Sequence, residues 1–519
     1  MKKFTLLLIT SFALFTLFTN CSDDFLATSS LTQSAADQPF TSVTDVNLAL
    51  NGVYSVLQSS TMYGGDLNGW QGFPGFDNFG DNAFNQFKWE GPGLFMEGDL
   101  NPDSGPIRAI WTDLYSGIAR VNLVIDKLMQ AQNGELTDDQ INVSLGQAYF
   151  LRALFYFNLA VYFEDAPLIL EPQTVANAQV PKNTYEEITT QIVEDLTFSS
   201  EHLPESYPAE QFGYATKGAA LGLFARVQLY NQEYDGEFGV LALTEQILGL
   251  GYDLHPNYGE LFTPENEMSP EIIFSVRFQR ELGFDNGETF SATFNGTPKV
   301  DQRPMPNLVN AYYASDGLPI TESPLFDPNN ESANRDPRAN ATIYFDGDVF
   351  LEDLNRVFTG NSPTNYGMRK YIRRNSSDAE GVGASQPGSQ DFYVIRYADV
   401  LLMRAEAMAE TGNVSGAADL VNQVRERVNM PRVEDVEGIV GQQEMIDIVR
   451  HERRVELALE GLRFMDLKRW GTIADAFQRA ADDPVGPYNP NYSGGRSEVF
   501  PIPQSELDVN PNLVQHPSW

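Results

Sequence analysis

The feature that most constrains the fold is a helical pattern near the end of the chain, between residues 397 and 428. Four residues at helical spacing share one face of a first helix: Tyr397, Leu401, Ala405 and Met408. Gly412 and Asn413 end this helix, because both tolerate the left-handed conformation, and Ser415 can cap a second helix. The second helix carries its own apolar stripe: Ala417, Leu420, Val421, Val424 and Val428. The pair spans about one tetratricopeptide unit of roughly 34 residues, and an ordinary helical hairpin is the alternative.

Helical periodicity also fills the first half of the chain. The predicted helices cover residues 43–58, 106–130, 138–163, 184–200, 215–231 and 240–250. Residues 255–394 differ, because Pro and Gly are frequent there and short β-prone runs such as 271–278 replace the helical pattern. We therefore predict a mainly α fold in one domain, residues 43–519. Helical pairs at about 43–250 and 395–470 would carry an irregular, loop-rich lobe at about 255–394.

Net charge limits the choice of partner. The chain of 519 residues has a formal net charge of −37 and a pI near 4.3. Nucleic acid is excluded as an expected partner, because phosphate recognition needs a basic footprint.

The start of the chain predicts export. Lys2 and Lys3 precede an apolar run at residues 4–19, which is typical of a signal peptide over residues 1–20. Cys21, the one cysteine, follows this run and resembles the lipidated first residue of bacterial lipoproteins. Residues 21–42 are rich in Ser, Thr and Asp and would form a tether, whose acidic start resembles an outward-sorting tag. We expect a lipid anchor at Cys21 that holds the protein in the outer membrane, facing outward; simple secretion is the alternative.

Four segments in a fixed order carry a family resemblance. They read AYFLRALFYFNLAVYF at 148–163, RYADVLLMRAEA at 396–407, EMIDIVRHERRVELALEGLRFMDLKRW at 444–470 and FPIPQSELDVNPNLVQ at 500–515. Together they resemble the SusD/RagB family. The resemblance implies a surface lipoprotein with a helical-repeat fold. Such a protein captures nutrients, mostly glycans, beside a TonB-dependent (SusC-like) outer-membrane transporter.

Catalysis has little support in the sequence. The four histidines, at 202, 255, 451 and 516, show no metal-ligand spacing. Glu452, Glu456 and Glu460 recur every four residues, but arginines interleave with them, which favours an ion-pair network. A glycosidase needs two carboxyl groups that face each other across a sugar. We therefore predict no catalytic residue, no cofactor and no metal site.

Two aromatic loops are the predicted ligand sites. Aromatic rings can stack on the apolar faces of sugars, while Asn and Asp side chains bond the hydroxyl groups. The first loop, within residues 59–105, supplies Trp70, Phe73, Phe76, Asp77, Asn78, Asp81, Asn82 and Trp89. The second loop supplies Phe284, Phe290 and Phe294. The alternative role for most of these aromatics is to pack the loops onto the helices.

These observations predict a protein that binds oligosaccharide or polysaccharide without catalysis and delivers it to a partner transporter. The first alternative is a peptide-capturing surface lipoprotein of the same architecture. The others are a glycoside hydrolase of helical fold and a repeat adaptor that binds only proteins.

Overall fold

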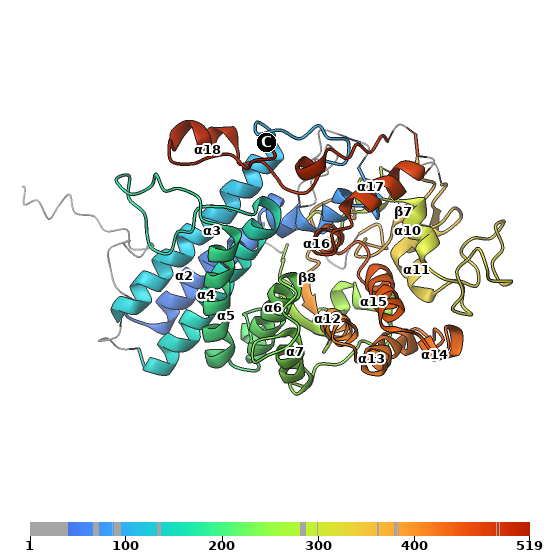
Figure 1. Cartoon of the computed structure of the whole chain (residues 1–519), viewed down its shortest axis with the longest axis horizontal. Coiled ribbons are helices and arrows are strands. Elements are labelled where there is room, and N and C mark those ends of the chain that lie inside the picture. Colours follow the sequence, from blue (N-terminus) through green and yellow to red (C-terminus); the bar gives the residue numbers. More distant parts are fainter. Residues whose placement is uncertain are drawn as a thin grey trace, which may run out of the picture.

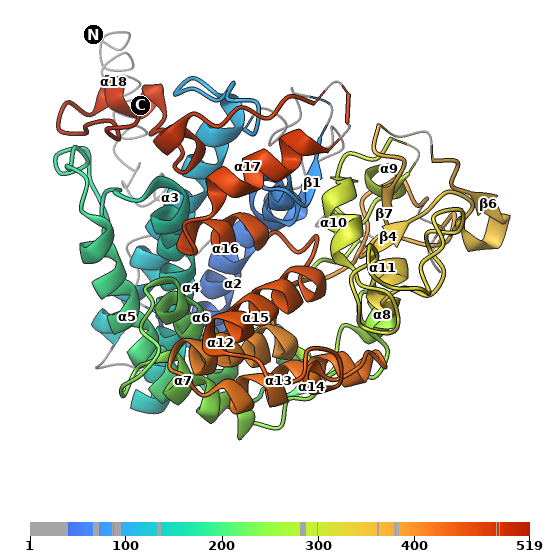
Figure 2. The same ribbon diagram turned by 45° about the vertical axis from the view of Figure 1, so that its right-hand side comes forward.

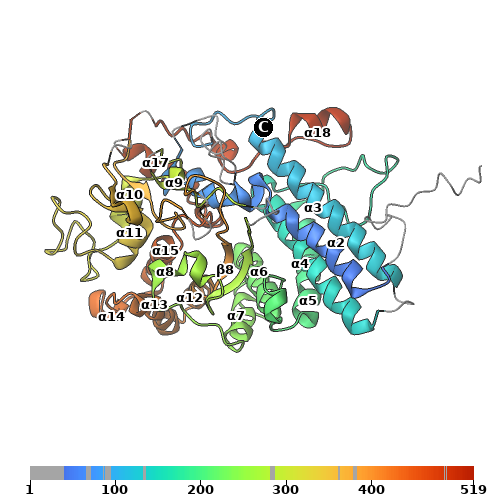
Figure 3. The same cartoon turned by 180° about the vertical axis from the view of Figure 1, so that it is seen from behind.

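The computed structural model describes residues 40–519 apart from residues 66–71, 86, 88–94, 132–135, 281–286, 298, 361–362, 378–380, 382, 484 and 487. Four long helices form one end of the molecule, at the left of Figure 1: α2 (Val43–Leu57), α3 (Gly105–Gln130), α4 (Asp138–Phe163) and α5 (Tyr185–His202). Their bounds lie within two residues of the predicted ones. α2 packs across α3 and α4, as Figure 3 shows from behind.

α4 is the central helix of this group, because it packs against α3, α5 and α2. Its second half is buried on every side from Phe150 to Phe163, as the continuous run of apolar residues requires. Arg152 is the charged residue in that buried half. Its guanidinium donates two hydrogen bonds to the carboxylate of Asp195 in α5, from Nε to Oδ2 at 2.8 Å and from Nη2 to Oδ1 at 2.7 Å. The bidentate pair satisfies both charges inside the core and fixes α4 to α5.

The helical pairs continue across a long interruption in the sequence. α6 (Lys217–Tyr230) packs on α5 and on α7 (Val240–Leu248). α7 in turn packs on α12 (Tyr397–Glu410), although residues 249–396 separate the two helices in sequence. α13 (Val414–Arg427) and α15 (Gln442–Glu456) complete the series, in the lower middle of Figure 1. The predicted mainly α fold with split helical pairs is confirmed.

Helix ends follow local side-chain chemistry. Thr216 caps α6, as predicted, because its hydroxyl accepts a backbone hydrogen bond from the first turn. Gly412 ends the α12 region with φ of +86°, which also agrees with the sequence. The predicted cap at Ser415 is wrong. Asn413 caps α13, because its side-chain oxygen accepts the N–H of Gly416 at 3.1 Å and the helix begins directly after it.

The irregular lobe is an excursion between α7 and α12 that is closed at its base by a strand pair. β2 (Ile272–Val276) pairs antiparallel with β8 (Phe392–Arg396). The lobe contains α8 (Tyr258–Leu261), η7 (Pro264–Asn266), α9 (Thr293–Gly296), β3 (Arg303–Pro304), α10 (Pro306–Ala311), α11 (Pro337–Thr342), β4 (Ile343–Tyr344), β5 (Val349–Leu351), η8 (Glu352–Leu354), β6 (Arg356–Val357) and β7 (Gly367–Met368). Figure 2 shows the lobe to one side of α15. Tyr312 and Tyr344 share a hydrophobic cluster with Leu459, so the lobe packs directly on the helical part.

The remaining segments cover the top of the molecule in Figure 1 and join its two ends. They are η2 (Ser60–Gly64), η3 (Phe73–Phe79), β1 (Ala83–Phe84), α16 (Arg463–Arg469), α17 (Ile473–Asp482), η9 (Gly494–Ser497) and α18 (Gln504–Val509). Two short elements lie elsewhere: η6 (Ala209–Gln211) precedes α6, and α14 (Val433–Val436) packs on α13. α16 packs against η3, so the end of the chain holds a segment from its beginning. In the part of the chain that the structure describes, no helix combines the length and apolar character needed to cross a membrane.

Candidate functional site

The described part of the first aromatic loop, residues 72–85, is folded into the core. Phe73 and Phe76 lie against Tyr162 of α4, with ring centroids 5.6 and 5.0 Å apart. The ring of Phe76 also meets that of Phe500 at 6.3 Å. Both phenylalanines are buried, so their ring faces contact protein and leave no surface for a sugar.

The polar residues of the same loop are buried with it. Asp77, Asn78, Asp81 and Asn82 each expose 3% or less of their surface. Asp81 accepts bonds from the Nε atoms of Arg463 and Arg479, both at 2.7 Å. The six described positions predicted in this loop are therefore buried in the structure, and for Phe73 and Phe76 this is the packing role that the sequence left open as the alternative.

The remaining predicted positions divide in two. Trp70, Trp89 and Phe284 lie outside the described residues. Phe290 is buried, whereas Phe294 is half-buried and lies with its ring centroid 6.0 Å from the ammonium group of Lys299. Of the four predicted ligand-site aromatics that the structure describes, Phe294 is the one with an accessible surface.

A cavity of about 540 Å³ opens in the lobe, and we call it the lobe cavity. Thr293 and Thr297, which flank Phe294 by one and three residues, belong to its lining. The other lining residues are Phe350, Leu351, Leu354, Arg356, Val357, Thr359, Ser376, Gly383, Ala384, Ser385 and Gln386. The lining thus combines residues with hydroxyl and amide groups and apolar residues, a combination that suits a sugar with its polar rim and apolar face.

The apolar wall of the lobe cavity was not singled out from the sequence. Most of it comes from the β5–β6 hairpin, where Leu354 and Val357 expose 52% and 45% of their surfaces. A pair of apolar residues in a short β-prone segment was the available signal. It is weak, because single exposed apolar residues are common on protein surfaces.

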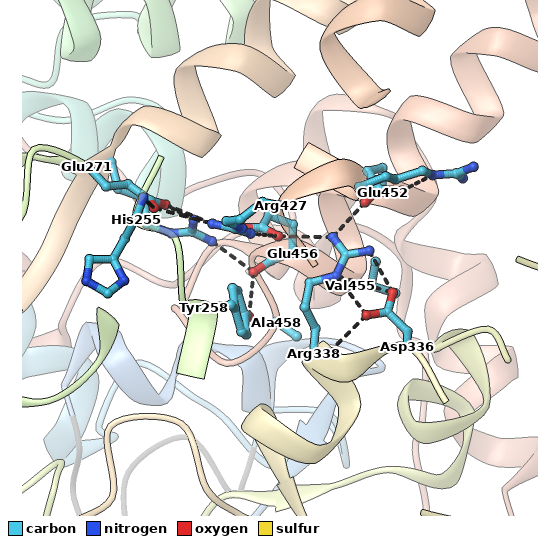
Figure 4. A network of polar contacts seen from close by, with 12 residues as sticks. His255, Tyr258, Glu271, Asp336, Arg338, Arg427, Glu452, Val455, Glu456 and Ala458 are labelled. Carbon is cyan, nitrogen blue, oxygen red and sulfur yellow. Dashed lines mark hydrogen bonds and ion pairs between the residues drawn. The ribbon is translucent and has the colours of Figure 1, made fainter. Parts of the chain in front are cut away.

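The carboxylate row on α15 forms the ion-pair network of Figure 4. Glu456 contacts three arginines: Arg427 Nη2 at 2.6 Å, Arg396 Nη1 at 2.7 Å and Arg338 Nη1 at 3.0 Å. Glu452 accepts from Arg338 Nη1 at 2.6 Å. Because Arg338 belongs to α11 and Arg427 to α13, the network joins the lobe to the helical pairs.

The charge state of this network opposes catalysis. Burial alone would favour the protonated form of Glu456, but Arg427, Arg396 and Arg338 hold its pKa well below the usual range. A general acid needs the opposite shift. Among the described residues, no group of three or more His, Cys, Asp or Glu side chains could hold a metal ion.

Fold and site together define a protein of split helical pairs that carries a loop-rich lobe with a cavity, and whose row of glutamates is held in ion pairs. Comparison with known sequences identifies the family to which the chain belongs. A family model described as the SusD family matches residues 270–519, and one described as "starch-binding associating with outer membrane" matches residues 25–229. The chain belongs to the SusD/RagB family, whose members are non-catalytic binding proteins.

Individual relatives agree over nearly the full length. SusD-like protein P25 of Formosa agariphila is 28% identical over 528 residues, which is 95% of this chain and 95% of that protein. The crystal structure of a SusD-like carbohydrate-binding protein from Bacteroides fragilis superposes with a TM-score of 0.78 at 27% identity, covering 91% of this chain and 99% of the other. A laminarin-binding SusD-like protein gives a TM-score of 0.71 at 26% identity, covering 92% and 100%.

Proposed function

We propose that this protein binds an oligosaccharide or polysaccharide at the cell surface and passes it to a TonB-dependent transporter in the same outer membrane. The observation that carries the proposal is the match of SusD-group models to residues 25–229 and 270–519, which include both predicted ligand loops. Solved structures with the same fold belong to carbohydrate-binding and laminarin-binding proteins.

The proposed glycan site combines Phe294 and the lobe cavity with the aromatics predicted from sequence, Trp70, Trp89 and Phe284. One ring that covers roughly 50 Å² of a sugar contributes about 1.3 kcal/mol at ~25 cal/mol/Å². Three or four rings with a few hydrogen bonds reach about 4–7 kcal/mol, which corresponds to millimolar to tens of micromolar affinity. Such an affinity suits a receptor that releases its ligand to a neighbour.

Lipid attachment at Cys21 would keep the receptor beside the transporter. A tether raises the effective concentration of the ligand at the transporter without any new contact. The expected consequence is that Cys21→Ser moves the protein from the outer-membrane fraction to the soluble fraction of cells. An unchanged distribution would contradict the anchor.

Affinity electrophoresis tests the glycan proposal. The mature chain is run in native gels containing one neutral or anionic polysaccharide each, beside Trp70→Ala, Trp89→Ala and Phe294→Ala. Phe238→Ala is the matched control, because Phe238 is also a partly exposed phenylalanine but lies before α7. We expect retardation by one glycan, loss of retardation in at least one site variant, and no release of reducing sugar. Equal retardation of all variants would refute the proposed site, and no retardation of the wild type would refute the function.

A further inference from the structure

A second hollow lies away from the lobe cavity, where α2 ends beside β2. Its volume is about 270 Å³, and we call it the Tyr214 pocket. The residues that give it its chemistry are Asn51, Tyr54, Gln58, Phe212, Tyr214 and Arg277. They come from α2, from the segment that leads into α6, and from the residue that follows β2. The volume falls just below the range of drug-sized ligand sites, so the pocket has room for one sugar ring.

Aromatic rings form the walls of the Tyr214 pocket. The rings of Tyr54 and Tyr214 have centroids 5.5 Å apart and are tilted by 36°. Phe212 completes the set, with the Arg277 guanidinium 4.9 Å from its ring centroid. All three rings are half-buried, so each keeps an open surface. Three partly exposed rings within one small pocket suit stacking on the apolar faces of a pyranose.

The aromatic walls are held rigidly in place. The Tyr214 hydroxyl donates to Asn51 Oδ1 at 2.9 Å. The Tyr54 hydroxyl accepts from the N–H of Ala215 at 2.9 Å and donates to Gln147 Oε1 at 3.2 Å. Because the rings are already fixed, a ligand loses little free energy to the ordering of these side chains.

Polar groups at the pocket keep unused hydrogen-bonding capacity. Gln58 donates from Nε2 to the carbonyl of Arg277 at 2.7 Å, which leaves its Oε1 as an acceptor. In the described parts of the chain, neither the Asn51 amide nitrogen nor the terminal nitrogens of Arg277 make a hydrogen bond. A sugar hydroxyl both donates and accepts, so this mixture of N–H donors and a carbonyl acceptor matches it.

The charge around Arg277 selects a neutral ligand. Arg277 Nε pairs with the buried carboxylate of Asp391 at 3.2 Å. Because this pairing compensates the charge of Arg277, the pocket offers an anionic sugar no unpaired cation, and the formal net charge of −37 of the chain disfavours such a sugar further. Hydroxyl groups carry no charge and meet neither penalty.

We propose that the Tyr214 pocket is a second carbohydrate-binding site, which holds one neutral pyranose ring between the tyrosine walls and the Arg277 side. The proposal extends the proposed glycan binding to a position that neither predicted loop includes. The pocket lies at the roots of both loops, since Gln58 precedes the first and Arg277 the second, so one glycan chain can reach it as well as the loop site.

Saturation-transfer difference NMR on the whole mature protein tests this site. The probes are D-glucose, D-galactose, D-mannose, D-xylose and, as the anionic arm, D-glucuronate. We expect at least one neutral sugar to bind with a dissociation constant on the order of 1–10 mM, and glucuronate to give a weaker signal than glucose. Tyr214→Ala should weaken binding about tenfold, since it removes one stacking face. Tyr214→Phe keeps the ring and should retain most of the affinity.

Further variants make the test decisive. Asn51→Ala should reduce binding, and Arg277→Lys should reduce it while still pairing with Asp391, so that no buried charge is left alone. Tyr492→Ala, at another partly exposed tyrosine, should leave binding unchanged. Melting temperatures confirm that each variant is folded. The proposal that the Tyr214 pocket binds a sugar is refuted if the signal is unchanged in both Tyr214→Ala and Asn51→Ala, or if no neutral sugar gives a signal.

The outcome for the pocket is separable from the outcome for the proposed function. One outcome is that polysaccharides retard the wild type, that retardation depends on Trp70 or Trp89, and that Tyr214→Ala weakens the NMR signal of no monosaccharide. This outcome supports the proposed function and refutes sugar binding in the Tyr214 pocket. The opposite outcome is that the signal of a monosaccharide is lost in Tyr214→Ala while no polysaccharide retards the protein. This outcome supports sugar binding in the Tyr214 pocket and refutes polysaccharide capture.

Discussion

For two aspartates that lie four residues apart, the structure predicts opposite effects of pH on the free energy of unfolding. Asp77 and Asp81 both lie in the buried segment after η3 begins, and neither exposes any surface. Asp77 accepts the backbone N–H of Arg463 at 3.2 Å, and within the described structure its other carboxyl oxygen has no partner. Burial raises the pKa of Asp77 to about 7. Burial acts on Asp81 too, but Arg454 and Arg463 overcome it and hold the pKa of Asp81 well below its usual range.

The sign of each effect follows from proton linkage. The folded state binds a proton at Asp77 more tightly than the unfolded chain does. The contribution of protonated Asp77 to the free energy of unfolding is therefore fully present below about pH 4. This contribution is lost as pH rises to about 7. Three pKa units correspond to roughly 4 kcal/mol. At about 2.1 cal/mol/K per residue over about 480 folded residues, this is a shift of roughly 4 °C in melting temperature.

The assay is differential scanning calorimetry of wild type, Asp77→Asn and Asp81→Asn between pH 4 and 8. Asp77→Asn should gain stability relative to wild type as pH rises, with most of the change between pH 4 and 7. Asp81→Asn should be less stable near neutral pH by about 3–5 kcal/mol, because it leaves buried arginines unpaired. Its deficit should shrink as pH falls through the acid range, where the wild-type carboxylate loses its charge. A difference between Asp77→Asn and wild type that stays constant from pH 4 to 8 would refute the argument.

Two further predictions concern packing. Arg338→Met, which leaves Glu452 and Glu456 with one cation fewer in the core, should lower stability by about 3–5 kcal/mol in chemical denaturation. Arg432→Met is the control, because it also removes contacts to three carboxylates, but at the surface. It should change the free energy of unfolding little. Equal losses of stability in the two variants would contradict the role of burial. Gly461→Ala should destabilise more than Gly412→Ala in the same assay. Both glycines have positive φ, but a Cβ at 461 would collide with the backbone of the η3 segment, whereas one at 412 would meet open space; equal losses would mean that strain alone matters.

The sequence determined the helices closely. The bounds of α3 and α4 lie within one residue of prediction, because the 3.6-residue period and the capping residues are local properties. The four ordered segments also indicated the family, and the arginines among Glu452, Glu456 and Glu460 indicated an ion-pair network. Each of these inferences depends on residues that are neighbours along the chain or on one helix.

Only the tertiary structure decided which aromatic and polar loop residues are accessible. Phe76 looks like a sugar-stacking ring in sequence, yet Tyr162 and Phe500 cover it, and both come from distant parts of the chain. Asp81 looks like a hydroxyl-binding carboxylate, yet Arg463 and Arg479 close over it from nearly 400 residues away. The Tyr214 pocket was equally hidden, because three separate segments build it. Burial of a loop side chain depends on its long-range partners, and no local pattern specifies them.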